Sequence, residues 1–122
     1  MDISRVEFKE YPNGVVKASI HGCRHDALDK INRKFVATTT SAIEVTDAWS
    51  RAAKDYYMNN TYTAIARCSN DDTYSFEEGK KIALKRLTEK YNRSVDKRIA
   101  RFLMHMDKVC KSLDKYFENR TF

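Results

Sequence analysis

Apolar and charged residues alternate along the first part of the chain, over residues 3–20. Alternation of this kind places successive side chains on opposite faces of a β-strand. The alternation is interrupted at Pro12-Asn13-Gly14, where Pro fixes φ and Asn-Gly tolerates positive φ. The pattern therefore predicts a β-hairpin over residues 3–20. Its apolar positions are Val6 and Phe8 before the turn, and Val16, Ala18 and Ile20 after it.

The middle of the chain has shorter patterns. A helix of one or two turns is expected to open near Asp26, and residues 42–45 have the β-branched character of a strand. Asp47 is a suitable N-cap for a short helix over residues 48–57, because its carboxylate can accept a hydrogen bond from the first free backbone N–H groups. Residues 61–68 alternate again and predict a further strand.

A helical pattern fills the rest of the chain, from Phe76 to Phe117. Ser75 is a good N-cap, and Glu77 and Glu78 lie in the first turn, where the helix dipole favours negative charge. A single helix of about 42 residues would be roughly 63 Å long, which is too long for one compact domain of this size. We therefore expect a break near residues 92–94, with Ser94 capping a second helix. The alternative is one helix that extends away from the body or pairs with a second copy.

These elements predict an α+β fold in a single domain, residues 1–122. Residues 1–68 would form mostly a small antiparallel sheet with short helices, and residues 76–118 would be helical. Gly79 and Ala83 lie on successive turns at the start of the long helix. A glycine inside a helix costs about 1 kcal/mol relative to alanine, so Gly79 indicates that the helix approaches the sheet closely there.

Charge is distributed unevenly over the 122 residues. The formal net charge is +6, and residues 79–122 hold 13 Lys and Arg against 5 Asp and Glu. A basic C-terminal third suggests a polyanion or an acidic protein surface as the partner, although a solvated helix face would have the same composition. The three cysteines are widely spaced, which favours reduced thiols in a cytosol. With no signal-like or membrane-spanning segment, we expect a cytoplasmic protein that does not engage a membrane.

No arrangement of residues predicts an enzyme or a cofactor. His21, Cys23 and His25 would share one face of a strand and could hold a metal, but a structural zinc site needs four ligands and the other two His and Cys candidates are distant. A loop with incidental His and Cys is the simpler interpretation. The carboxylates of residues 71–72 and 77–78 could hold a divalent cation, but helix capping already accounts for the second pair. We expect no catalytic residue, no metal and no cofactor.

A run of basic residues is the stronger functional indication. Arg86 and Lys90 are four residues apart, and Lys97 and Arg101 continue their row. Such a row could follow nucleic-acid phosphates without reading sequence, and Tyr91 beside it could stack on a base, although a core position suits Tyr91 better. The apolar positions from Ile99 to Phe117 could form an oligomer seam. The candidate binding residues are Lys80, Lys81, Lys85, Arg86, Lys90, Arg93, Lys97, Arg98 and Arg101.

One stretch, from Thr63 to Leu87, resembles a motif of small phage and prophage proteins of unknown function. In those proteins a strand ends in Lys/Arg-Cys, and an acidic turn, an aromatic residue, Glu and Gly precede a helix. The matching residues are Arg67, Cys68, Asp71, Asp72, Tyr74, Phe76, Glu78, Gly79 and Ala83.

The resemblance covers about a fifth of the chain and implies a viral or mobile-element origin. It leads us to expect a phage-encoded, non-enzymatic protein that inhibits a host defence nuclease or ribonucleoprotein complex by covering its surface, as anti-CRISPR proteins do. The alternative is a nucleic-acid-binding accessory protein of a phage, which would contact DNA or RNA directly. Either protein would work in the cytoplasm of a bacterial host cell.

Overall fold

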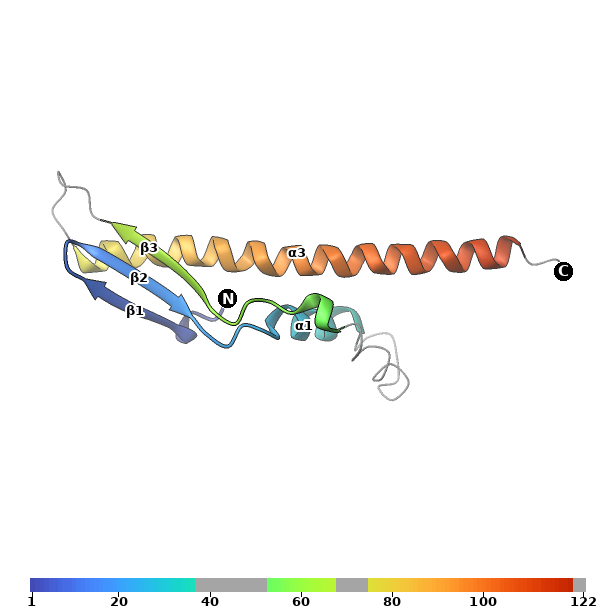
Figure 1. Cartoon of the computed structure of the whole chain (residues 1–122), viewed down its shortest axis with the longest axis horizontal. Coiled ribbons are helices and arrows are strands. Elements are labelled where there is room, and N and C mark those ends of the chain that lie inside the picture. The colour runs from blue at the N-terminus through green and yellow to red at the C-terminus, as the bar shows by residue number, and fades with distance from the viewer. Residues whose placement is uncertain (37–52, 68–74, 120–122) are drawn as a thin grey trace.

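The computed structural model describes residues 1–36, 53–67 and 75–119. It has the expected α+β architecture, with a three-stranded antiparallel sheet, short helical segments and one long C-terminal helix (Figure 1). The elements in chain order are η1 (Ile3–Arg5), β1 (Val6–Tyr11), β2 (Val15–Ile20), α1 (Asp26–Ile31), η2 (Asn32–Val36), η3 (Ala53–Tyr56), β3 (Tyr62–Arg67) and α3 (Phe76–Glu118).

The predicted hairpin is confirmed as strands β1 and β2. They pair antiparallel with Phe8 opposite Ala18. The turn between them needs two residues of positive φ, and Asn13 (69°) and Gly14 (71°) supply them. Strand β3 then pairs antiparallel with β2, so that the order is β1-β2-β3 and β2 lies in the centre.

The short elements agree with the sequence in part. Helix α1 begins at Asp26, and β3 occupies most of the strand expected over residues 61–68. The strand expected over residues 42–45 lies outside the described residues, as does the first part of the helix expected over residues 48–57. The end of that second segment is a 3-10 turn, η3.

The core forms where α3 packs against the sheet. Strand β2 contributes Val16, Ala18 and Ile20, and the facing side of α3 contributes Ala83 and Leu87; all five are fully buried. A second cluster joins α1 and η3 to the middle of α3 through Leu28, Ile31, Tyr56 and Phe102. From Ala83 to Phe102, one face of α3 is therefore buried, first by the sheet and then by α1 and η3.

The break expected near residues 92–94 was wrong. Helix α3 runs without interruption through 43 residues. Ser94 does not cap a second helix, because its side chain is buried and bonds to the Tyr62 hydroxyl from β3 and to the Arg98 guanidinium one turn later. Ser94 thus joins the helix to the sheet.

The C-terminal part of α3 extends beyond the body. Figure 1 shows the sheet and α1 beside the first part of the helix, and the orange-to-red end passing beyond them. Every residue from Met106 to Asn119 is exposed. The alternative in the sequence, a single helix leaving the body, is the arrangement that the structure adopts.

Candidate nucleic-acid interface

A small hollow of about 240 Å³ lies between α3 and the segment leading into β3. Four cations line it, and no carboxylate does. All four lie on successive turns of α3. They gather at one hollow because residues three or four apart share a helix face. The lining residues are Asn59, Tyr62, Lys90, Arg93, Ser94, Lys97 and Arg98. We call this hollow the basic pocket.

A chain of hydrogen bonds lies beneath the basic pocket. The backbone N–H of Asn59 donates to the Tyr62 hydroxyl at 3.2 Å, and that hydroxyl bonds to the Ser94 hydroxyl. Ser94 in turn accepts from the Arg98 guanidinium at 2.8 Å. Arg98 also donates to the carbonyl oxygens of Tyr57 and Ser94, each at 3.3 Å. The network therefore fixes the guanidinium of Arg98 at the edge of the pocket.

Four of the nine predicted basic residues bond to backbone carbonyls of the body. Arg86 donates to Ile65 at 2.8 Å and Lys90 to Thr63 at 3.1 Å, both in strand β3. Arg98 donates to the carbonyl of Tyr57, and Arg101 donates to the carbonyl of Asp55 at 2.7 Å. These side chains have a structural role, although their charge still adds to the potential on this side of α3.

The other five differ in position. Lys80 and Lys81 lie next to first-turn glutamates, at 3.7 Å from Glu77 and 3.5 Å from Glu78. Their charge is largely balanced locally. Of the nine predicted residues, three make no side-chain hydrogen bond or ion pair within the described part of the chain: Lys85, Arg93 and Lys97. Of these, Arg93 and Lys97 line the basic pocket.

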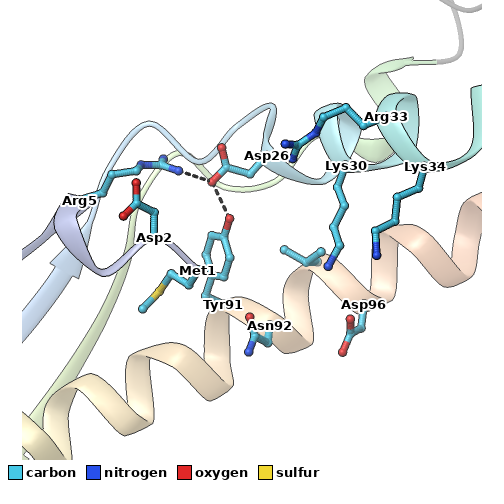
Figure 2. A pocket seen from close by; sticks show the side chains of 11 residues that line it. Met1, Asp2, Arg5, Asp26, Lys30, Arg33, Lys34, Tyr91, Asn92 and Asp96 are labelled. Atoms are coloured by element: carbon cyan, nitrogen blue, oxygen red, sulfur yellow. Dashed lines mark hydrogen bonds and ion pairs between the residues drawn. The ribbon is translucent and has the colours of Figure 1, made fainter. Parts of the chain in front are cut away.

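A larger groove of about 760 Å³ lies between α1, α3 and the N-terminal residues (Figure 2). Figure 2 shows an internal network at one end of it, in which Asp26 accepts from the Arg5 guanidinium at 2.9 Å and from the Tyr91 hydroxyl at 2.7 Å. Burial, reinforced by the bond to Asp26, raises the pKa of Tyr91 well above its ordinary value, so the hydroxyl keeps its proton and donates. The bond to Asp26 also raises the pKa of Arg5. This network holds α1 against α3.

The groove is lined by charges of both signs, including Lys30, Arg33 and Lys34 as well as Asp2 and Asp96. The basic pocket is therefore the better candidate for an anion. Tyr91 is 8% exposed and its hydroxyl is engaged, so Tyr91 belongs to the core and cannot stack on a base.

His21, Cys23 and His25, the candidate metal ligands, each contact different neighbours. The His21 imidazole bonds to the Thr61 hydroxyl at 3.0 Å, and His25 packs edge-on against Tyr57. Cys23 is fully buried, and that burial raises the pKa of its thiol. Across residues 1–36, 53–67 and 75–119, no three His, Cys, Asp or Glu side chains gather as a metal site requires.

The carboxylate pair of residues 71–72 lies outside the described residues. Glu77 and Glu78 are exposed beside Lys80 and Lys81, at the start of the helix. Ser75 caps that start, since its hydroxyl accepts from the Glu78 N–H at 3.4 Å. Helix capping and ion pairs thus account for the second glutamate pair.

Sequence reasoning identified the cations of the basic pocket but not its other wall. Asn59 precedes β3 and Tyr62 is the first residue of that strand. Both are about thirty positions from the cations in the chain, and no local pattern links them to α3. The one available signal was Ser94, a polar residue within the apolar face of the helix.

Comparison with known protein families, with curated protein sequences and with solved structures finds no significant match. The resemblance to small phage proteins therefore stays a prediction. No helix within the described ranges combines the length and the apolar character that crossing a bilayer requires.

Proposed function

We propose that this protein binds nucleic acid non-enzymatically, by holding backbone phosphates along the basic face of α3. The observation that carries the proposal is the basic pocket, in which Lys90, Arg93, Lys97 and Arg98 surround one hollow without a carboxylate. Like charges spaced three or four residues apart destabilise a helix. An anion in the pocket would relieve that repulsion.

The pocket provides both fixed and adjustable donors. Arg98 is held by Ser94 and by a backbone carbonyl, so little entropy is lost when it binds an anion. Arg93 and Lys97 are exposed and can turn toward a phosphate. Arginine suits this role because its planar guanidinium can contact two phosphate oxygens at once.

The binding mode should be independent of base sequence. Tyr91, the aromatic residue adjacent to the basic row, is buried in the core, so phosphate contact rather than base stacking would supply the affinity. Binding of this kind weakens steeply with salt, because neutralised phosphates release their counterions.

The test is titration of labelled single-stranded DNA, single-stranded RNA and duplex DNA with wild-type protein and with the double variant Arg93→Glu, Lys97→Glu. These two side chains make no hydrogen bond or ion pair within the described residues, so their replacement should leave the fold intact. We expect at least tenfold weaker binding. If both contact single-stranded phosphates, the slope of log K against log salt falls by about 1.4.

A matched control has the same change of net charge elsewhere on α3. Lys108→Glu with Lys115→Glu reverses two exposed lysines beyond the body. The control should bind nearly as well as wild type at equal salt. Equal losses in both double variants would show only a net-charge effect, and unchanged binding by the pocket variant would refute the proposal.

A second candidate is the one expected from the phage resemblance, inhibition of a host defence complex. The same basic face favours it when that complex contains RNA, because phosphate contact would then occur on the ribonucleoprotein. Capture from a bacterial lysate, with and without nuclease, separates the two functions. A host protein complex retained after nuclease supports inhibition, whereas loss of all partners supports direct nucleic-acid binding.

A further inference from the structure

The projecting half of α3 carries an apolar stripe with the spacing of a coiled coil. Met106, Val109, Leu113 and Tyr116 follow one another at intervals of three, four and three residues, which is the a/d pattern of a heptad repeat. Their exposed fractions are 45%, 51%, 52% and 57%. Leu103 and Phe117 widen the stripe on one side and are also about half exposed.

The same half of the helix is electrically neutral. Residues 80–101 contain nine Lys and Arg against two Glu and Asp, whereas residues 102–119 contain three of each. The phosphate-binding role proposed above therefore does not extend into this half. A neutral apolar stripe fits another protein surface, and it does not repel a second copy of itself.

The body determines how two copies can meet. At about 100° per residue, the stripe continues the face of α3 that Leu87 and Phe102 bury against the body. In a parallel pair the seam would run directly into both bodies, and two strongly basic segments would lie side by side. An antiparallel pair keeps the bodies and the basic segments at opposite ends.

We propose that the protein forms an antiparallel homodimer through residues 103–117 of α3. Phe102 already packs against Tyr56 and its neighbours, so it is not available to the seam. An antiparallel pairing that uses only exposed apolar side chains places Val109 against Leu113 of the partner subunit, and Met106 against Tyr116 of the partner subunit. Six apolar side chains about half exposed would bury on the order of 1,100 Å² over both copies, near the lower bound for a stable interface.

The first test is the molar mass of the full chain in solution, measured by light scattering over a hundredfold range of concentration. The mass should rise from 14.3 kDa towards twice that value. Leu113→Glu should keep the protein monomeric throughout, whereas Lys108→Glu on the polar side should dimerise like wild type. A monomeric wild type, as expected if residues 37–52 of the same chain cover the stripe, would overturn the proposal, and so would dimerisation of Leu113→Glu.

The second test establishes orientation. Met106→Cys and Tyr116→Cys are prepared separately with Cys68 and Cys110 replaced by serine, and the fully buried Cys23 is left in place. An antiparallel pair should form a disulfide when the two variants are mixed, and little when either is oxidised alone. Efficient self-crosslinking of Met106→Cys would show a parallel pair and refute the geometry.

Discussion

Replacing Gly79 by alanine tests how closely α3 approaches the sheet. A Cβ atom at Gly79 would lie 2.5 Å from Cγ2 and 3.3 Å from Cβ of Val16. Carbon atoms attract best at about 3.5–4.0 Å, so the new methyl group would overlap Cγ2 by at least about 1 Å. Val16 cannot move away easily, because it is fully buried in the central strand and a β-branched side chain has few rotamers.

The expected cost follows from two opposing effects. Alanine is better than glycine in a helix by about 1 kcal/mol, while overpacking a core costs about 1–3 kcal/mol. With an overlap of this size we expect the upper end of that range, and so a net loss of about 2 kcal/mol in the free energy of unfolding. At a slope of about 1.5 kcal/mol per M, the urea midpoint would fall by roughly 1.3 M.

The assay is urea unfolding followed by circular dichroism, applied to a double-mutant cycle with Val16→Ala. Removing Cγ2 should itself destabilise the core, but the second mutation should then cost little, so the two changes should couple by about 2 kcal/mol. Lys81→Ala, an exposed change on the same helix, is the control and should stay within about 0.5 kcal/mol of wild type. A Gly79→Ala variant as stable as wild type would refute the close approach.

Three further predictions concern buried polar groups. Tyr91→Phe should lower the free energy of unfolding by about 1–2 kcal/mol. Folding raises the pKa of Tyr91 above its ordinary 10.0, so its contribution to wild-type stability should be complete below pH 10 and should be lost as the pH rises further. Unfolding of the variant at a series of pH values should show a shallower decline above pH 10. Ser94→Ala should lower the unfolding free energy by about 1–2 kcal/mol, and in a double-mutant cycle it should couple with Tyr62→Phe, which removes the other hydroxyl; strictly additive losses would contradict the bond between them. In a Cys68→Ser background a thiol reagent should modify exposed Cys110 rapidly and buried Cys23 only on unfolding, and equal rates would contradict the described burial.

Local chemistry was sufficient to predict several parts of the fold. The turn at Asn13-Gly14 and the cap at Ser75 each depend on neighbours within a few residues, and both form as expected. The close packing expected at Gly79 is also present, against Val16.

Long-range contacts explain what the sequence did not reveal. Ser94 has the chemistry of a cap, but its hydroxyl bonds to Tyr62, thirty-two positions earlier, from within an uninterrupted helix. Arg86 and Lys90 similarly look free for a ligand until β3 lies beside them. The basic row was predictable from the sequence. Which of its side chains bond to the body, and which do not, depends on the backbone carbonyls that the fold brings near.

The bonds from Arg86 and Lys90 to β3 also affect how the sheet meets other chains. Strand β3 is an edge strand, and an edge with vacant carbonyls can recruit a strand from a neighbouring molecule. The two side chains occupy carbonyls of alternate residues, Ile65 and Thr63, so they close this edge to such pairing. Of the two edges of the described sheet, β1 is the one whose backbone these side chains leave uncovered. Charge removal at Arg86 and Lys90 would consequently promote aggregation. Weaker nucleic-acid binding by that variant would therefore not by itself show that the two side chains contact phosphate.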